Sequence, residues 1–220
     1  MIDSLLLNPH ISEYIRSLEP DLPESLERLY EDAVSGKVPV IRREAQSLLR
    51  FLLVLTAPKR ILEIGTAVGF SACFMASVSP SSEIITLEKD PDRVREAGKN
   101  ITEQGFSDRI TVREGDAAAL LSELSASGER FDFIFLDAAK AQYPDYLTSI
   151  RKLLPEGGVL LTDNIFQEGS LSESKFSVTR RNRTIHIRMR EYVRLLKSDS
   201  NLETVILPVG DGMTVSVKRG

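Results

Sequence analysis

Five short apolar segments alternate with helix-like segments between residues 58 and 164, and this alternation restricts the fold more than any other feature. Each apolar segment is rich in Ile, Leu, Val or Phe, and the stretches between them carry apolar residues at helical spacing. Such alternation predicts a parallel sheet covered by helices on both faces. The expected strands are RILEIG (60–65), EIITLEKD (83–90), RITVREGD (109–116), FDFIFLDA (131–138) and GVLLTDN (158–164).

The two ends of the chain depart from this alternation. Residues 1–57 carry helical patterns such as ESLERLYEDAV and predict an N-terminal helical cap. Residues 202–220 hold two alternating strands around Gly210-Asp211-Gly212, which is typical of a β-hairpin. We expect an α/β, doubly wound, Rossmann-like sheet, mostly parallel with a C-terminal antiparallel hairpin. The cap and the core at 58–220 would form a single domain over 1–220.

Composition excludes several classes of protein. With 220 residues, 27% charged residues and a net charge of −4, the chain is neither a membrane-spanning protein nor a uniformly basic nucleic-acid coat. Its one cysteine, Cys73, excludes an internal disulfide framework and suits a reducing compartment. The first twenty residues lack the pattern of a signal peptide. We therefore expect a cytoplasmic protein.

A glycine-containing turn, EIGTAVGFS, follows the first expected strand at residues 63–71. Glycines here allow a sharp turn and a close approach of backbone to a ligand, and the next helix would present free amide groups to an anion. Gly65 and Gly69 do not form the G-x-G-x-x-G fingerprint of dinucleotide-binding proteins. The alternative is a tight turn that binds nothing.

Acidic residues end the second and third expected strands. Glu88 lies about 20 residues beyond the glycines, where a carboxylate can bind two ribose hydroxyls. Gly115-Asp116-Ala117 ends the third strand, and Asp116 could accept a hydrogen bond from an adenine amine. A solvated Glu88 and a helix-capping Asp116 are the alternatives. These features share the carboxyl edge of the sheet, where open α/β folds bind ligands.

Two carboxylates and one amide follow the fourth and fifth expected strands. Asp137 ends one, and Asp163 and Asn164 end the other. Neighbouring carboxylates repel unless they share a proton or a cation. An all-oxygen set without His or Cys suits a hard ion such as Mg²⁺. The alternative is that each residue caps a helix or turn.

These motifs together resemble the cation-dependent O-methyltransferases that use S-adenosylmethionine, a group with catechol and caffeoyl-CoA enzymes. The resemblance covers residues 38–220 and rests on EIGTAVGFS, Glu88, GDA, LDAAKAQY, TDN and PVGDG. Ala67 replaces the middle glycine of the general methyltransferase motif, a departure that belongs to this group. Within the group the chain is most similar to bacterial tRNA 5-hydroxyuridine methyltransferases, through VPVIRREA, DAAKAQY, TDNIFQEG and an Arg-rich segment.

The resemblance implies a class I methyltransferase sheet and a role for each motif. The metal ligands would be Asp137, Asp163 and Asn164, and Lys140 would be the catalytic base beside Asp137. Val40 and Ile41 would close over the cofactor. The full set of implied cofactor-binding residues is Val40, Ile41, Glu63, Gly65, Ser71, Glu88, Gly115, Asp116, Ala117 and Asp137.

The Arg-rich segment from Glu173 to Lys197 bears on the acceptor. It holds eight basic and two acidic residues, so its net charge is +6 while the rest of the chain carries −10. Such asymmetry suggests a polyanionic partner. The expected RNA-binding residues are Arg180, Arg181, Arg183 and Arg188. A solvated helix face and an interface with a partner subunit are alternatives, and a coenzyme-A thioester also carries phosphates.

The sequence therefore predicts a Mg²⁺-dependent, S-adenosylmethionine-dependent O-methyltransferase, with tRNA as partner and with a homodimeric assembly. Its leading substrate hypothesis is wobble 5-hydroxyuridine, converted to 5-methoxyuridine. A small-molecule methyltransferase of the catechol or caffeoyl-CoA type is the alternative, since a catechol also offers two adjacent oxygens. A regulatory module that binds the cofactor without catalysis is a third hypothesis, against which the metal trio and Lys140 argue.

Overall fold

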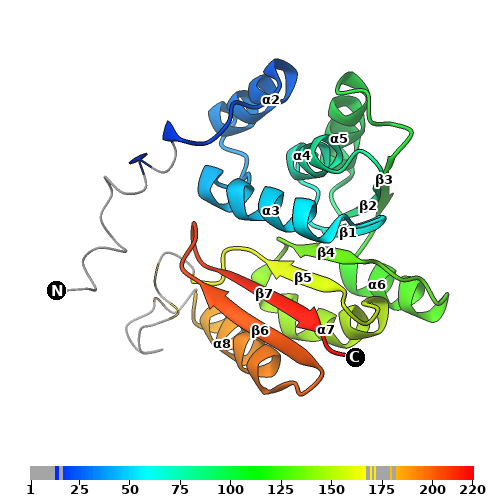
Figure 1. The fold of residues 1–220 in the computed structure, drawn as a ribbon, viewed down its shortest axis with the longest axis vertical. Helices are drawn as coiled ribbons and strands as arrows, with labels where there is room; N and C mark the ends of the chain where they lie inside the picture. The colour runs from blue at the N-terminus through cyan, green and yellow to red at the C-terminus, as the bar shows by residue number, and fades with distance from the viewer. Residues whose placement is uncertain (1–12, 15–16, 167–168, 170, 172–178, 180–181) are drawn as a thin grey trace.

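A computed structural model describes residues 13–14, 17–166, 169, 171, 179 and 182–220. Seven strands form one sheet in the order β3-β2-β1-β4-β5-β7-β6 (Figure 1). The strands are β1 (Arg60–Ile64), β2 (Glu83–Glu88), β3 (Ile110–Glu114), β4 (Phe133–Leu136), β5 (Val159–Thr162), β6 (Leu202–Leu207) and β7 (Met213–Lys218).

Strands β1 to β5 are parallel to one another, whereas β7 runs antiparallel to both β5 and β6. The pairing of β1 with β4 ends at Ile64 and Leu136, and that of β4 with β5 ends at Leu136 and Thr162. The residues that come next along these strands therefore meet at one edge of the sheet. This register brings the turns that begin at Gly65, Asp137 and Asp163 together.

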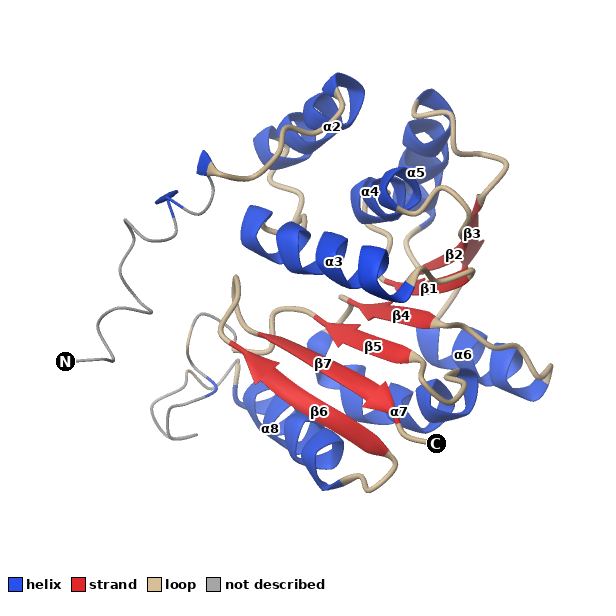
Figure 2. Ribbon diagram, in the orientation of Figure 1, coloured by secondary structure: helices blue, strands red, loops and turns tan. Residues whose placement is uncertain are grey.

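Helices cover the sheet in two layers (Figure 2). One layer packs α2, α3, α4 and α5 over a core that includes Phe70, Phe74 and Phe135. The other packs α6, α7 and α8 over a core that includes Tyr143 and Tyr192. The helices are α2 (Glu24–Ser35), α3 (Arg43–Thr56), α4 (Phe70–Val78), α5 (Pro91–Glu103), α6 (Ala117–Ala126), α7 (Tyr143–Leu153) and α8 (Arg183–Ser198), with a 3-10 turn η1 (Lys140–Gln142) before α7.

The structure confirms the predicted α/β class, the mixed sheet and the C-terminal hairpin. The residues Asp90 and Pro91 predict the start of a helix, because Asp is a common capping residue and Pro is favoured in the first turn. The structure confirms this start: Asp90 caps α5 by accepting from the Asp92 amide, and Pro91 lies in the first turn. Residues 1–12 and 15–16 of the expected helical cap lie outside the described residues, and the Arg-rich helix begins at Arg183. None of the helices that the structure describes combines the length and apolar character that a bilayer crossing requires.

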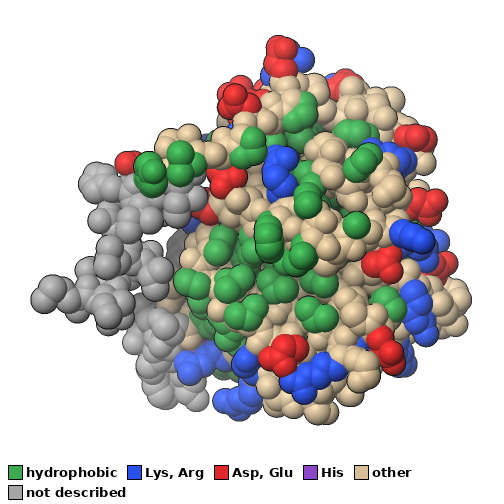
Figure 3. Space-filling view, in the orientation of Figure 1, with side chains coloured by type: hydrophobic (Ala, Val, Ile, Leu, Met, Phe, Trp, Pro, Cys, Tyr) green, Lys and Arg blue, Asp and Glu red, His purple; other side chains and the backbone are tan. Residues whose placement is uncertain are grey.

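One face of the sheet carries an uncovered apolar surface beside α3, which we call the α3–sheet face (Figure 3). Helix α3 buries Leu49 and Leu53 but leaves three large apolar side chains more than 60% exposed. Strands β6 and β7 add two valines whose exposures are 48% and 37%. The α3–sheet face consists of Phe51, Val54, Leu55, Val205 and Val217.

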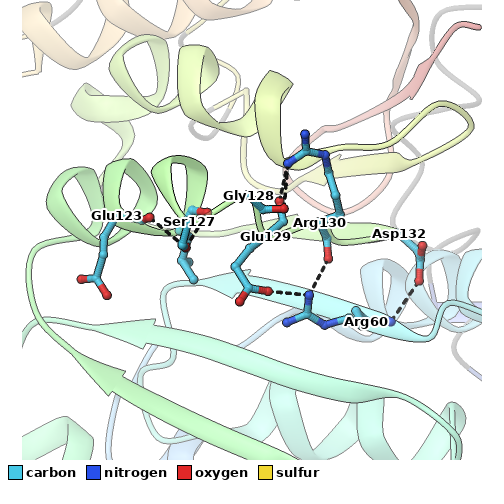
Figure 4. A network of polar contacts seen from close by, with 8 residues as sticks. Arg60, Glu123, Ser127, Gly128, Glu129, Arg130 and Asp132 are labelled. Carbon is cyan, nitrogen blue, oxygen red and sulfur yellow. Dashed lines mark hydrogen bonds and ion pairs between the residues drawn. The ribbon is translucent and has the colours of Figure 1, made fainter.

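At the opposite edge of the sheet, polar contacts close the amino ends of β1 and β4 (Figure 4). The Asp132 carboxylate accepts from the amides of Lys59 and Arg60 at 2.9 and 3.0 Å. The Arg60 guanidinium donates to the Arg130 carbonyl at 3.0 Å and pairs with Glu129 at 2.6 Å. These contacts satisfy the backbone there within the protein, whereas the carboxyl edge leaves its polar groups around a cavity.

We predict that Gly65→Ala destabilises the fold severely. Gly65 has a φ of +105°, and a Cβ there would lie 2.1 Å from the Asp137 carbonyl oxygen, a backbone atom that cannot rotate away. The clash and the strained backbone together cost at least about 3 kcal/mol of unfolding free energy. Urea unfolding followed by circular dichroism measures this loss.

Gly105→Ala is the matched control for this prediction. Gly105 also has a positive φ, +75°, but nothing lies within 4 Å of its Cβ position. Its replacement should cost only about 1 kcal/mol, which is the backbone contribution alone. Equal losses in the two variants would contradict the role assigned to the close approach at Gly65.

Candidate active site

A cavity of about 620 Å³ opens at the carboxyl edge of the parallel strands. Its wall contains the first residue after each of β1, β2, β3 and β4 and the second residue after β5, so the sheet register assembles it. Of the residues that the sequence singled out, the cavity is lined by Val40, Ile41, Gly65, Ser71, Glu88, Gly115, Asp116, Ala117, Asp137, Lys140 and Asn164. Glu63 and Asp163 lie beneath the wall and are almost completely buried.

The turn after β1 is fixed by backbone hydrogen bonds to both neighbouring strands. The Gly65 amide donates to the Leu87 carbonyl at 3.0 Å, and the Asp137 amide donates to the Ile64 carbonyl at 3.0 Å. Ala67 adopts a φ of +47° and donates its amide to the Glu88 carboxylate at 3.1 Å. The turn therefore holds its open conformation through contacts with the ends of β2 and β4.

Glu88 is oriented by three backbone amides. Its Oε2 accepts from Ala67, and its Oε1 accepts from Lys89 and Asp90 at 2.9 and 3.0 Å. These contacts fix the direction of the carboxylate at the cavity wall. A carboxylate offers about four acceptor positions, so one position, on Oε2, is left for a ligand hydroxyl.

Asp116 performs the capping role that the sequence offered as an alternative. Its Oδ1 accepts from the amides of Ala118 and Ala119 at 3.0 and 3.2 Å, at the start of α6. It also lines the cavity, so the same carboxylate caps the helix and leaves Oδ2 as an acceptor beside Ala117. Capping and ligand binding are compatible at this position.

Glu63 is a fully buried carboxyl below the glycine-containing turn, and it does not line the cavity as the cofactor-binding expectation implied. Burial raises its pKa to about 7, although the hydroxyls of Ser71 and Thr86 act in the opposite direction. Its Oε2 accepts from Thr86 at 2.5 Å, and Thr86 contacts Thr66 at 2.5 Å. Its Oε1 makes no hydrogen bond of good geometry with a described residue, although Ser71 lies close enough to affect the carboxyl.

The turns after β4 and β5 bring Asp137, Lys140 and Asn164 into direct contact. Asp137 Oδ1 accepts from Lys140 Nζ at 3.1 Å and from Asn164 Nδ2 at 3.2 Å. Asp163 lies beside them and is 2% exposed. Burial, followed by the charge of Asp137, raises the Asp163 pKa to about 7. The backbone of Asn164 is left-handed, with a φ of +57°, which turns its side chain back towards the cavity.

The donor set fits a divalent cation. The charge of Asp137 raises the pKa of Asp163, so a positive ion between the two carboxylates would be favourable, and Mg²⁺ prefers oxygen ligands. Rotation of the Asn164 amide about its last bond would present its oxygen in place of its nitrogen. No group of three or more His, Cys, Asp or Glu within the described ranges is placed to hold a metal, so the amide is needed as the third ligand.

Lys140 is 23% exposed and lies between Asp137 and the ring of Tyr143, whose centre is 5.7 Å from Nζ. Tyr143 is itself fixed, because its hydroxyl accepts from the Ala138 amide at 3.0 Å. The ammonium is thus held at the cavity wall beside the candidate cation ligands. It is positioned to interact with an acceptor oxygen that approaches the same ligands.

The Arg-rich helix, α8, offers less positive charge to an external partner than its sequence suggested. Arg188 donates to the Ala141 carbonyl and pairs with Asp145 and Glu191, so its charge is used within the chain. Arg183 lies in the first turn of α8 and is exposed. Arg180 and Arg181 lie outside the described residues.

Several residues that line the cavity were not predicted from the sequence. Gln142 and Tyr146 flank the adenine side expected at Asp116, and the Tyr146 hydroxyl donates to Gln142 at 2.5 Å. Arg42, the residue before α3, and Asp211, in the hairpin loop, also line the wall. The PVGDG segment carried a signal for Asp211, but nothing local showed that the hairpin loop returns to the strand ends.

Cys73 takes no part in the site. It is fully buried within α4, and burial raises the pKa of its thiol to about 12. A thiol of this kind is neither a nucleophile nor a metal ligand near neutral pH.

A protein-family model described as O-methyltransferase matches residues 16–219, which is nearly the whole chain. The chain belongs to the O-methyltransferase family. This membership, with the fold, makes it an S-adenosylmethionine-dependent O-methyltransferase and confirms the enzyme class that the motifs predicted. The match identifies the family but does not identify the molecule that accepts the methyl group.

Individual members of the O-methyltransferase family resemble this chain along most of their length. A caffeoyl-CoA O-methyltransferase of Eucalyptus gunnii is 30% identical over 224 residues, covering 96% of this chain and 88% of that protein. The structure of a proposed caffeoyl-CoA O-methyltransferase from Staphylococcus aureus has a TM-score of 0.87 at 29% identity, covering 94% and 98%. An O-methyltransferase of Bacillus cereus in complex with SAH has a TM-score of 0.83 at 25% identity, covering 96% and 97%.

We predict that Glu63 makes the stability of this methyltransferase fall with rising pH. Its folded-state pKa, about 7, lies above the ordinary value of 4.5, so the native state holds the proton more tightly. The stability gained from the protonated form is complete below about pH 4.5 and is lost as pH rises through 7. In the cofactor-free protein the loss should approach roughly 2–3 kcal/mol between pH 5 and 8.

Glu63→Gln keeps the side chain neutral and should remove this part of the pH dependence. Urea unfolding at pH 5 and pH 8 measures it as the difference between the variant and the wild type. Glu114→Gln, at an exposed carboxylate that ends β3, is the control and should leave the wild-type dependence in place. Identical pH profiles for wild type and Glu63→Gln would contradict the assignment.

Proposed function

We propose that this enzyme transfers a methyl group to a small-molecule acceptor with two adjacent oxygens, of the catechol or caffeoyl-CoA type, with the help of a divalent cation such as Mg²⁺. The observation that carries the proposal is the convergence of Asp137, Asn164 and Lys140 at one point of the cavity wall, with Asp163 buried beside them. The similarity to caffeoyl-CoA O-methyltransferases supports this class of acceptor over a nucleic acid.

The cavity offers a place for each part of S-adenosylmethionine. The methionine end would lie at Gly65, Ser71 and Asp137, beside the amide groups of the turn and above buried Glu63. The ribose hydroxyls would bind Glu88, and the adenine would lie near Asp116 and Ala117. Val40 and Ile41 would cover the cofactor from the α3 side. The SAH complex of the Bacillus cereus relative supports a cofactor of this kind.

Methyl transfer from a sulfonium is a direct displacement, so the chain needs no nucleophile. When bound, the cation would lower the pKa of the acceptor hydroxyl and fix its direction. Asp137, Asp163 and Asn164 would hold it, and Asp137 would lie between it and the methionine end of the cofactor. Lys140 Nζ, which contacts Asp137 Oδ1 at 3.1 Å, would take the acceptor proton once its own proton has left to solvent.

The second candidate acceptor is 5-hydroxyuridine at the wobble position of tRNA. Its O5 and O4 atoms are adjacent, so the same ligand geometry accommodates it. The observation in its favour is the +6 charge of the Arg-rich segment against −10 elsewhere. The internal pairing of Arg188 reduces this support, and a coenzyme-A thioester also suits a basic segment.

We predict turnover of caffeoyl-CoA or a simple catechol in the presence of Mg²⁺ and a labelled methyl donor. Chelation of the metal should abolish the activity and Mg²⁺ should restore it, while a monophenol should not react because it lacks the second oxygen. Hypomodified tRNA offered in the same assay separates the candidates. Methylation of tRNA alone would replace this proposal by the second one, and metal-independent turnover would contradict both.

Asp163→Ala tests the role of the cation separately from the binding of the cofactor. It should reduce turnover roughly 100-fold or more, because one of two carboxylate ligands is lost. Affinity for S-adenosylmethionine, measured by calorimetry, should change little, since Asp163 does not line the cavity. Equal losses of turnover and cofactor affinity would argue against this division of roles.

We also propose that the enzyme is a homodimer that buries the α3–sheet face. Phe51, Val54 and Leu55 are 62–69% exposed on one side of α3, and Val205 and Val217 continue the apolar surface on the sheet. Contiguous apolar surfaces of this kind on folded proteins mark interaction sites. A second copy would cover them symmetrically.

We predict that Leu55→Glu converts the dimer to a monomer. Analytical ultracentrifugation should give twice the chain mass for the wild type and the single-chain mass for the variant, because an unpaired charge would be buried at the interface. Ser122→Glu adds the same charge at an exposed position of α6 and should remain dimeric. A monomeric wild type would refute the proposal.

A further inference from the structure

Arg188 makes three different contacts from the middle of α8. Its Nε donates to the backbone carbonyl of Ala141 at 2.9 Å. Its Nη2 binds the Asp145 carboxylate, and its Nη1 binds Glu191 at 3.0 Å. The side chain is 27% exposed, so it is partly enclosed between α8 and the start of α7. Every nitrogen of the guanidinium therefore has a partner within the chain.

Ala141 is the middle residue of η1, the short turn that carries Lys140 on one side and Gln142 on the other. Lys140 and Gln142 both line the cavity. A 3-10 turn of three residues has few internal hydrogen bonds and depends on outside partners for its conformation. Asp145 lies in the first turn of α7, directly after η1. Arg188 thus binds this segment on both sides of Gln142.

The geometry requires an arginine. A planar guanidinium presents donors in fixed directions and can bind a carbonyl and two carboxylates at once. A lysine at this position would have one nitrogen and could not reproduce the fork. If Arg188 only neutralised the nearby carboxylates, a lysine would serve equally well. The additional contact with the Ala141 carbonyl is what distinguishes arginine from lysine at this position.

The same helix also contacts the strand that precedes the other candidate cation ligands. The Tyr192 hydroxyl and Thr162 Oγ1 are 2.7 Å apart, and Thr162 is the last residue of β5 before Asp163. The Tyr192 ring meets Tyr143 edge-on, with centres 5.3 Å apart. One turn of α8 therefore supports the segment after β4, and the next supports the end of β5.

We propose that Arg188 is a positioning residue for methyl transfer, which holds η1 so that Lys140 faces the acceptor oxygen. Arg188 does not touch the cavity and acts through the Ala141 carbonyl and Asp145. This assigns to Arg188 a role inside the enzyme in place of the RNA contact that its sequence suggested. The inference rests on the proposed role of Lys140.

The test compares Arg188→Gln with Arg194→Gln, an exposed arginine further along the same helix. Arg188→Gln should lower kcat at least 10-fold. The KM for the acceptor and the Kd for S-adenosylmethionine should stay within about 2-fold, because the residues proposed to hold the cation and the cofactor lie outside η1. Arg194→Gln should match the wild type in all three quantities. Unchanged kcat in a folded Arg188→Gln protein would refute the proposal, as would a parallel loss of cofactor affinity.

Arg188→Lys tests whether the planar donor geometry of the guanidinium is required or only its positive charge. It should keep the pairing with Asp145 and recover less than half of the lost kcat, since the carbonyl contact at Ala141 is not rebuilt. Full recovery would mean that charge alone matters and would overturn the proposal.

Amide hydrogen exchange gives a readout that does not depend on the identity of the acceptor. In Arg188→Gln the amides of residues 139–143 should exchange at least 10-fold faster than in the wild type, with no change in α5. Unchanged exchange at η1 would refute the local role of Arg188. Faster exchange together with absent turnover on every acceptor would refute the proposed function while supporting this part of the inference.

Discussion

The close approach between the turn after β1 and the backbone of Asp137 is the constraint on which the site depends. A side chain at residue 65 would collide with the Asp137 carbonyl, so only glycine lets β1 and β4 end at the same level. That contact sets the height of Asp137 relative to the cofactor turn. It also places the next strand, β5, so that Asp163 and Asn164 reach the same point. The candidate cofactor and cation sites therefore share one wall because of a single missing Cβ.

Much of this arrangement could be predicted from local patterns. The apolar segments correctly predicted the five parallel strands. Asp90 and Pro91 predicted the start of α5, and the glycines on either side of Asp211 predicted the hairpin. The strand ends then gave Glu88, Asp116, Asp137 and Asn164, because parallel strands in register bring their carboxyl ends together. These predictions succeeded where structure follows from residues close in the sequence.

The parts that could not be predicted depend on contacts between distant segments. Nothing near Arg188 shows that its guanidinium meets a carbonyl 47 residues earlier, so its charge was interpreted as available to a partner. Glu63 has the residue type of a ligand-binding carboxylate, yet burial beneath the turn gives it a pKa near 7. In both cases packing decides what a charged side chain does, and charge counted along the chain does not reveal it.

Cys73 has a practical consequence for experiments on this enzyme. It is the one cysteine of the whole chain, and it is inaccessible within α4 with a thiol that stays protonated at neutral pH. Thiol-directed dyes and spin labels should leave the native protein unmodified. A cysteine introduced on α8 or at the rim of the cavity would then be the single labelled position. The natural sequence therefore needs no removal of cysteines before distances between the cavity rim and α8 are measured with introduced labels.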